Sequence, residues 1–162
     1  MRGHRAAMPY PAAMQAEDIQ IRELTAEELP LILPLIEKHN AKIAPEELRR
    51  RLEVMIPCGY HCIAAFLGGR IVGVAGYWLG ARFYCGEYMD VDNVVVDETL
   101  RSQGIGALMM DWLHSKAAET GCKVVVLDSY TTYAGAHRFY FRLGYQILGF
   151  HFSREVKDGE AK

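Results

Sequence analysis

A glycine-rich turn between an apolar strand and an amphipathic helix constrains the fold of this chain more than any other feature. The turn consists of Arg101, Ser102, Gln103, Gly104, Ile105, Gly106 and Ala107. A valine-rich strand at about 88–96 precedes it, and the apolar residues that follow recur at helical spacing: Ile105, Leu108, Met109, Trp112 and Leu113. An apolar strand at 124–127 comes next. Because a strand, helix and strand in this order form a parallel, right-handed unit, the sequence predicts an α/β fold with a mixed sheet.

Turn and cap residues divide the rest of the chain into further elements. Gly68 and Gly69 predict a two-residue hairpin turn, Thr25 with Glu28 predicts a capped helix start, and Pro45 opens another helix. The expected strands cover about 19–24, 61–67, 70–79, 88–96, 124–127 and 145–152. The expected helices cover about 25–38, 45–56, 104–120 and 134–143. The predicted order is therefore β-α-α-β-β-β-α-β-α-β.

The domain organisation follows from the length and from the composition of the two ends. A chain of 162 residues and 18.3 kDa fits one domain. Residues 1–17 are rich in Ala, Pro and Met without any period, so we expect a disordered or loosely ordered tail in which Met8 or Met14 could be the true start. The predicted domain covers 18–156, and 157–162 form a short C-terminal tail.

The composition argues against several classes of protein. A net charge of -2 and a pI of about 6.3, with scattered basic residues, argue against a nucleic-acid partner. We find neither a signal peptide nor a stretch of about 20 apolar residues that could span a membrane, so we expect a cytoplasmic protein without a membrane partner. The cysteines form neither a disulfide framework nor a metal-ligand set, so we expect no metal; they are Cys58, Cys62, Cys85 and Cys122.

The glycine-rich turn suits a phosphate group. Glycines let the backbone approach an anion, and the unpaired amides and dipole of a helix N-terminus favour negative charge. A tight turn whose glycines serve packing alone is the alternative. Neither the G-x-G-x-x-G motif of dinucleotide-binding proteins nor the Gly-Lys-Ser/Thr ending of a P-loop is present. The turn therefore predicts a ligand that carries a pyrophosphate.

Two sequence signatures together resemble those of the GNAT N-acetyltransferases. The turn matches the pyrophosphate-loop pattern Q/R-x-x-G-x-G/A, and residues 136–145 match A-x-x-F-Y-x-x-x-G-Y/F. The second match rests on Ala136, Phe139, Tyr140, Gly144 and Tyr145. The resemblance covers about 88–144 well, whereas only the order of elements agrees over about 19–79. It implies the GNAT-like acyl-CoA N-acyltransferase fold, a mixed α/β sheet whose central strands splay apart.

The resemblance implies that the ligand is acetyl-CoA, used as a co-substrate. In this family the pantetheine arm lies along the fourth strand, which corresponds here to Val94, Val95 and Val96. The backbone amide near Val94 is expected to polarise the thioester carbonyl. The turn at 101–107 is expected to bind the pyrophosphate, and the hydroxyl of Ser102, which replaces a common glycine, is expected to bond a phosphate oxygen.

The resemblance also implies which side chains catalyse the reaction. Tyr140 matches the family's tyrosine near the cofactor sulfur, where a phenol protonates the departing thiolate; a buried core tyrosine is the alternative. Asp90 precedes Gly104 by fourteen residues, the position of the catalytic glutamate in the histone-modifying branch, and is the expected base. Asp92 and Glu87 are expected to join it in attracting a cationic amine, and a solvated strand edge is the alternative.

These expectations combine into one function. We expect an N-acetyltransferase that moves the acetyl group of acetyl-CoA to a small-molecule or peptidic primary amine by direct attack in a ternary complex. A non-catalytic CoA-binding or regulatory module on the same fold is the alternative. The sequence leaves open the acceptor, homodimer formation, and the cofactor contact at Tyr133, where the family often has asparagine.

Overall fold

The computed structural model describes residues 18–156, which divide into two compact units, one ending at Val126 and one beginning at Leu127. The helices and strands, with 3-10 helices marked η, are β1 (Ile19–Glu23), η2 (Leu29–Ile32), α1 (Leu33–His39), α2 (Pro45–Met55), η3 (Ile56–Cys58), β2 (His61–Leu67), β3 (Arg70–Arg82), β4 (Gly86–Val96), η4 (Glu98–Leu100), α3 (Ile105–Glu119), β5 (Val124–Leu127) and α4 (Ala134–Arg142). The predicted tails at 1–17 and 157–162, with the candidate starts Met8 and Met14, lie outside the described residues.

The described strands form one sheet in the order β1-β2-β3-β4-β5. Neighbouring strands from β1 to β4 are antiparallel. The amide of Lys123, just before β5, donates to the carbonyl of Glu87, near the start of β4, at 2.7 Å. The two strands therefore begin side by side, as expected of a parallel pair joined by α3. The predicted α/β fold with a mixed sheet is confirmed.

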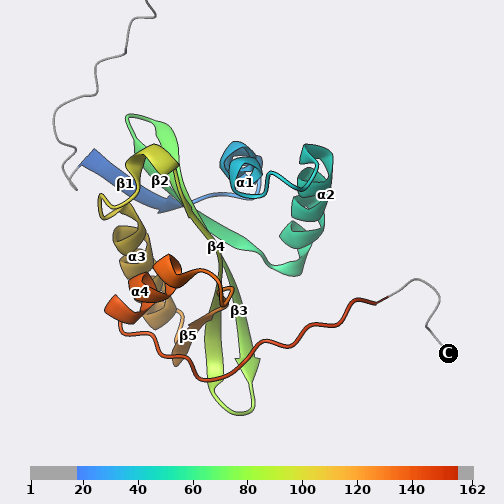
Figure 1. Ribbon diagram of the computed structural model, residues 1–162, viewed down its shortest axis with the longest axis vertical. Helices are drawn as coiled ribbons and strands as arrows, with labels where there is room; N and C mark the ends of the chain where they lie inside the picture. Colours follow the sequence, from blue (N-terminus) through green and yellow to red (C-terminus); the bar gives the residue numbers. More distant parts are fainter. Residues whose placement is uncertain (1–17, 157–162) are drawn as a thin grey trace, which may run out of the picture. The chain divides into compact units, whose positions relative to one another are not determined.

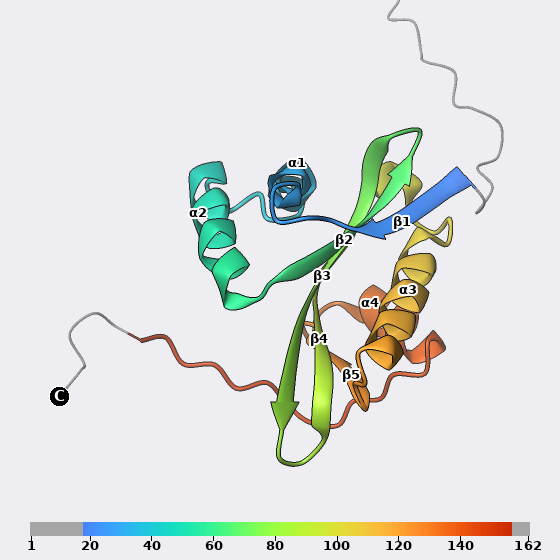
Figure 2. The ribbon, with the colours of Figure 1, turned by 180° about the vertical axis from the view of Figure 1, so that it is seen from behind.

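Helices cover both faces of the sheet in the first unit. Figures 1 and 2 show α1 and α2 over one face and α3 over the other. The core between α1, α2 and the sheet includes Leu33, Ile36, Leu52, Val74 and Val95. On the other face, α3 buries Ile105, Met109 and Leu113, and it approaches so closely that a Cβ at Gly73 would lie 3.0 Å from the sulfur of Met109. Burial of this apolar stripe fixes the position of α3 against the sheet.

The first helical region starts later than predicted. The carboxylate of Glu28 accepts a hydrogen bond from the amide of Thr25 at 3.0 Å, as in a capping box, but the helix α1 begins only at Leu33. Pro30 lies in the first turn of η2, and Pro34 lies in the first turn of α1. Because proline has no amide hydrogen, it is tolerated in a first helical turn and breaks a longer helix into two short ones.

The expected strand at 145–152 is wrong. No strand follows β5 in the part of the chain that the structure describes, and the apolar side chains of this segment are exposed, including Ile147, Leu148, Phe150 and Phe152. A run of apolar and aromatic residues forms a strand only when a neighbouring strand supplies hydrogen-bond partners. The second unit contains α4 and only the last residue of β5, so its described residues offer this segment no strand to pair with.

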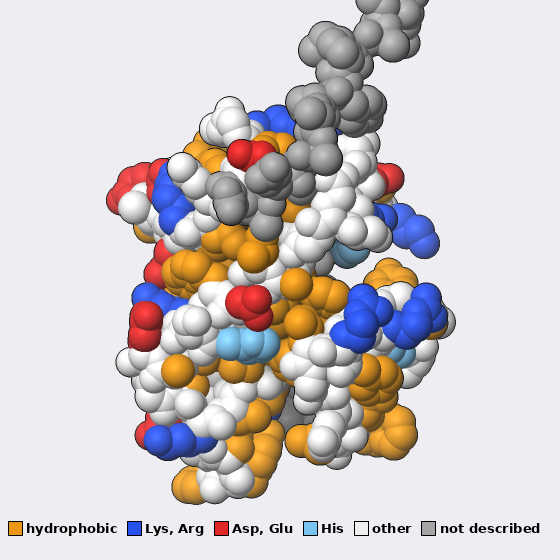
Figure 3. Space-filling view, turned by 90° about the vertical axis from the view of Figure 1, so that its left-hand side faces the viewer, with side chains coloured by type: hydrophobic (Ala, Val, Ile, Leu, Met, Phe, Trp, Pro, Cys, Tyr) orange, Lys and Arg blue, Asp and Glu red, His pale blue; other side chains and the backbone are white. Residues whose placement is uncertain are grey.

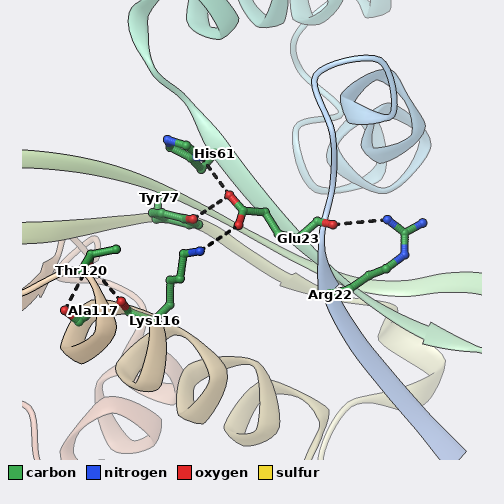
Figure 4. Close-up of polar contacts among 7 residues, drawn as sticks. All are labelled: Arg22, Glu23, His61, Tyr77, Lys116, Ala117 and Thr120. Carbon is green, nitrogen blue, oxygen red and sulfur yellow. Dashed lines mark hydrogen bonds and ion pairs between the residues drawn. The ribbon is translucent and has the colours of Figure 1, made fainter.

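A polar network centred on Glu23 lies on the α3 side of the sheet (Figure 4). The hydroxyl of Tyr77 donates to the Glu23 carboxylate at 2.7 Å, and the same carboxylate lies 2.9 Å from Nδ1 of His61 and 3.3 Å from Nζ of Lys116. Burial raises the pKa of Glu23, but the hydrogen bonds from these three residues lower it by more, so the net shift is downward. The ionised carboxylate therefore connects β1, β2, β3 and α3.

We predict that Glu23→Gln destabilises the protein at neutral pH and has less effect in acid. Because the folded pKa of Glu23 lies below the unfolded value, its carboxylate stabilises the fold above the unfolded pKa, and this stabilisation is lost as the pH falls through the folded pKa. Thermal unfolding followed by circular dichroism should show a difference from wild type at pH 7 that shrinks below about pH 4. Glu53→Gln, on the exposed side of α2, is the control. A difference independent of pH would contradict this role of Glu23.

Candidate functional site

A β-bulge interrupts β4 in the middle of the predicted site. The register between β3 and β4 shifts at Ala75, which faces both Asn93 and Val94. Asn93 has a φ of 50°, a left-handed conformation that asparagine adopts more readily than most residues. Bulges of this kind bend a strand and occur often beside functional sites.

The bulge changes which residues of β4 direct their backbone groups toward β5. Before the bulge, the carbonyl of Glu87 points toward β5 and accepts the hydrogen bond from the residue preceding that strand. After the bulge, the amide of Asp97 points in the opposite direction and donates to β3 at 2.8 Å. Because backbone groups alternate between the two sides of a strand, those of Val94 and Val96 point away from β3.

β5 is too short to reach these two valines. It has 4 residues, which span about 13 Å at about 3.3 Å per residue, and it begins beside the start of β4. β4 has 11 residues, so Val94–Val96 lie beyond the end of β5. Within the first unit, the backbone groups of Val94 and Val96 therefore face an edge that β5 leaves uncovered.

The turn before α3 presents a row of unpaired amides. Ser102 and Gly104 both have left-handed backbones, with φ of 62° and 86°. Among residues 18–156, the amides from Ser102 to Ala107 donate no backbone hydrogen bond, and the first such bond of α3 runs from Leu108 to the carbonyl of Gly104 at 3.1 Å. Left-handed residues in a turn can direct successive amides to one side, and the dipole of the 15-residue α3 favours an anion there. This end of the helix is suited to a phosphate group.

The structure brings two of the three predicted carboxylates onto one face of β4. Asp90 pairs with Trp78 and Asp92 with Gly76, so both lie on the face that packs against α1 and α2. Glu87 lies on the opposite face of β4, because it is an odd number of residues from both, and its side chain is exposed. Glu87 therefore does not join Asp90 and Asp92.

Asp90 has a cationic neighbour that the sequence did not predict. The guanidinium of Arg82 lies 3.5 Å from its carboxylate and 4.1 Å from the ring centroid of Tyr88. The same guanidinium donates to the hydroxyl of Tyr84 at 2.8 Å. Arg82 reaches Asp90 because β3 extends three residues beyond its predicted end, and the unpredicted register of the β3–β4 hairpin brings these residues together.

Tyr60 is a second residue of this face that the sequence did not single out. Its hydroxyl lies so close to Gly76 that a Cβ there would collide with it. Cys62 pairs with Gly76 from the β2 side, as Asp92 does from the β4 side. Burial raises the pKa of Tyr60 well above its ordinary value and the pKa of Cys62 to about 12, and the charge of Asp92 adds to both shifts. Tyr60 and Cys62 are therefore both protonated at neutral pH.

The second unit holds Tyr140 in a turn made by the second sequence signature. After α4, the amide of Gly144 donates to the carbonyl of Phe141 and that of Tyr145 to the carbonyl of Tyr140, both at 3.1 Å. The rings of Tyr140 and Tyr145 meet edge to face with centroids 5.7 Å apart. Burial raises the pKa of Tyr140, so its phenol keeps its proton at neutral pH. Tyr133, in the place of the family's asparagine, packs against Tyr130.

A depression of about 460 Å³ lies between β1 and α3, and none of the predicted site residues lines it. Its lining includes Ile21, Leu108 and Trp112, and Figure 3 shows hydrophobic side chains among charged ones on the side where β1 and α3 lie.

The described residues contain no cluster of three or more His, Cys, Asp or Glu that could hold a metal ion. None of the described helices is both long and apolar enough to cross a bilayer.

The chain is similar in sequence to known acetyltransferases. Residues 20–145 match the Acetyltransferase (GNAT) family. The aminoalkylphosphonate N-acetyltransferase of Salmonella typhimurium is 26% identical over 97 residues, a match that covers 59% of this chain and 63% of that protein. The chain therefore spans less than two thirds of that relative. The uncharacterized N-acetyltransferase YhdJ of Bacillus subtilis is 26% identical over 141 residues, which cover 85% of this chain and 99% of that protein.

The fold is also similar to that of solved acetyltransferases. The crystal structure of an aminoglycoside acetyltransferase from an uncultured soil metagenomic sample, in complex with trehalose, superposes with a TM-score of 0.73. The match covers 88% of this chain and 99% of that one at 20% sequence identity. At this identity the likeness supports the fold and carries no conclusion about the acceptor.

We predict that Gly76→Ala destabilises the protein by about 1–3 kcal/mol, because the added methyl group overlaps the buried ring of Tyr60. Urea unfolding measures this loss. Gly135→Ala is the matched control, since a Cβ there meets nothing within 4 Å, and it should change the stability by no more than about 0.5 kcal/mol. Equal stability of Gly76→Ala and wild type would show that Tyr60 does not cover this part of the sheet.

Proposed function

Because the chain belongs to the GNAT family of acetyltransferases, we propose that it transfers the acetyl group of acetyl-CoA to a primary amine. The observation that carries this proposal is the row of unpaired amides from Ser102 to Ala107 at the start of α3. It continues the edge at which the backbone groups of Val94 and Val96 point away from β3. Together they match a ligand that has a pyrophosphate at one end and amide groups along its arm.

Each part of acetyl-CoA has a proposed partner. The amides and the Ser102 hydroxyl in the turn bind the pyrophosphate, and the remaining turn residues Arg101, Gln103, Ile105, Gly106 and Ala107 shape its site. The pantetheine arm lies along Val94, Val95 and Val96 as an added strand, and it is bound by backbone groups of Val94 and Val96. The amide of Val94 donates to the thioester oxygen as negative charge develops on it.

The proposed reaction is a direct attack in a ternary complex. The acceptor nitrogen forms a bond with the thioester carbon, and the carbon–sulfur bond breaks with its electron pair on sulfur. Tyr140 donates its phenolic proton to the departing thiolate, a role that its raised pKa favours by keeping it protonated beforehand. The acceptor reacts as the neutral amine, its ammonium form having first lost one proton to water, and one of the carboxylates on β4, Asp90 or Asp92, receives the second proton that the nitrogen loses.

We propose a small cationic amine as the acceptor. Asp90 and Asp92 place two carboxylates on one face of β4, with the guanidinium of Arg82 3.5 Å from the first, and carboxylates attract a cation. Trp78 lies on the same face, with its ring centroid 5.2 Å from that of Tyr60, and aromatic faces also bind cations. The name of the Salmonella relative, an aminoalkylphosphonate N-acetyltransferase, supports an amine of this size.

The proposed function is tested by measuring released CoA with DTNB against a panel of amines. The panel contains aminoalkylphosphonates, aminoglycosides, polyamines, amino acids and peptides with a free N-terminus. Turnover of at least one amine, absent without enzyme, supports the proposal. Tight binding of acetyl-CoA with no turnover of any amine would instead favour a non-catalytic CoA-binding module.

We predict that Gly104→Val abolishes acetyl-CoA binding. A β-branched residue is strained at a φ of 86°, so the backbone that directs the turn amides cannot keep its conformation. Acetyl-CoA at 100 times its Kd should stabilise the wild type by about 2.7 kcal/mol in thermal unfolding and should not stabilise this variant.

Gly121→Val is the matched control for Gly104→Val. Gly121 has a φ of 81° and equally open surroundings, but it lies after the opposite end of α3. This variant should lose similar intrinsic stability and keep the stabilisation by acetyl-CoA. Loss of that stabilisation in both variants would mean that strain, and not the turn, explains the effect.

We predict that Tyr140→Phe lowers kcat by about 100-fold and leaves the KM for acetyl-CoA nearly unchanged, because the ring remains and only the proton donor is lost. Steady-state kinetics at pH 7 measure both constants. Tyr130→Phe, at an exposed tyrosine, is the control. An unchanged kcat in Tyr140→Phe would remove Tyr140 as the acid.

A further inference from the structure

We propose that Arg82 binds an anionic group of the acceptor, a carboxylate, phosphate or phosphonate, about 10 Å from the amine that is acetylated. The acceptor is then the amine proposed above with a negative group at its far end. The inference rests on the acetyl transfer proposed above and deepens it by naming the chemistry of the acceptor. Three features of Arg82 support it: how its guanidinium is held, which face of the sheet it occupies, and how far it lies from Val94.

The guanidinium of Arg82 lies on an aromatic platform. A Cβ at Gly80 would lie 2.9 Å from the ring of Tyr88, so the ring covers Gly80, where the absent side chain leaves room for it. The guanidinium lies over this ring, 4.1 Å from its centroid, and it donates to the hydroxyl of Tyr84 at 2.8 Å. A planar group that is already stacked and hydrogen-bonded loses little further freedom when it binds an anion.

The fork of Arg82 is less occupied than that of Arg22. The guanidinium of Arg22 donates twice to the carboxylate of Glu28, both times at 2.7 Å. That of Arg82 lies 3.5 Å from the carboxylate of Asp90, which exceeds the roughly 2.7–2.9 Å of a direct charge-assisted hydrogen bond. Because a guanidinium has more N–H groups than its contacts with Asp90 and the tyrosine platform engage, Arg82 can bind a further oxyanion without giving up a bidentate pair.

The strand register places Arg82 on the face that carries the proposed acceptor. Arg82 pairs with Gly86 and Trp78 pairs with Asp90, and an even number of residues separates them along both strands. Their side chains therefore share one face of the sheet, which also carries Asp92. The side chain of Arg82 is 37% exposed, so a ligand can reach its guanidinium from solvent.

The distance along β4 sets the length of the acceptor. The guanidinium of Arg82 lies beside Asp90, which precedes Val94 by four residues. Four residues of an extended strand span about 13 Å, and the contacts at the two ends shorten the span that the ligand itself must cover to about 10 Å. This length corresponds to about three residues of an extended peptide, or to an ω-amino acid of similar span. A shorter acceptor cannot contact Arg82 while its nitrogen attacks the thioester.

The arrangement also fixes the direction in which such an acceptor binds. Arg82 provides a positive charge at the start of β4, whereas the carboxylate of Asp92 lies nearer the bulge. An acceptor with an ammonium group at one end and an anion at the other therefore binds with its nitrogen toward Val94. The reverse direction places like charges together, so the two ends of the acceptor are distinguished.

The first test compares acceptors of equal length that differ only in the end group. Each pair consists of an ω-amino acid and the amino alcohol with the same number of carbon atoms. Aminoalkylphosphonates of the same lengths distinguish a tetrahedral anion from a planar one. For the pair that spans about 10 Å, kcat/KM of the wild type should be about tenfold higher with the anionic acceptor. For much shorter pairs the ratio should be near one.

Variants of Arg82 test whether this residue causes the preference. Arg82→Gln should reduce the ratio to about one, with the loss falling on the anionic acceptor. Arg82→Lys keeps the positive charge without the planar fork and should retain part of the preference. Arg22→Gln is the matched control, because Arg22 also lies over an aromatic ring, 4.7 Å from the centroid of Phe66, and beside a carboxylate. Its strand β1 does not neighbour β4, and its ratio should equal that of the wild type.

Calorimetry tests the same site without turnover. With CoA present, the ω-amino acid should bind the wild type with a Kd about tenfold below that of the amino alcohol. Arg82→Gln should bind the two ligands alike. Stabilisation of each variant by acetyl-CoA should match that of the wild type, which shows that the variant is folded and binds its co-substrate.

The outcomes separate this inference from the proposed function. If the wild type acetylates no amine but prefers the anionic ligand in calorimetry through Arg82, the proposed function fails and the role of Arg82 stands. If the wild type uses and binds both end groups alike at every length, the role of Arg82 is overturned. It is also overturned if Arg82→Gln keeps the full preference, or if Arg22→Gln loses as much of it.

Discussion

The extra residue in β4 at Asn93 is the constraint on which the site depends. Before this residue, the backbone carbonyl of Glu87 points toward β5. After it, the backbone groups of Val94 and Val96 point to the same side of β4. The same shift keeps Val95 in the core under α1 and α2, on the face that carries Asp92. One left-handed residue, at a cost of about 1–3 kcal/mol, thus turns two backbone groups toward the open edge without exposing the core side chain between them.

The packing of α3 supplies the second half of the site. Ile105, Met109 and Leu113 are almost fully buried, so the helix cannot move away from the sheet without exposing them to water. Its first turn is therefore held beside the end of β4, and the amides before it remain unpaired in a turn shaped by Ser102 and Gly104. A donor set fixed by the fold binds an anion without first having to be ordered.

Local patterns in the sequence predicted the elements that local interactions form. The turn, the helix after it, the hairpin at Gly68 and the strand β5 all follow from glycines and hydrophobic spacing, and the structure agrees. Features that depend on register between strands were missed, including the bulge at Asn93 and the ion pair of Arg82. The prediction of a strand at 145–152 was wrong for a related reason, since the alternation of apolar residues carries no information about a partner strand.

The central claim is that the amides of the β4 edge and of the turn are free in the protein and become bonded by acetyl-CoA. Amide hydrogen exchange followed by NMR tests it directly, residue by residue, with and without CoA. The account predicts fast exchange at Val94, Val96 and residues 102–107 in the free protein and protection of the same amides when CoA is added. Protection of these amides in the absence of CoA, or no change when it binds, would contradict the account.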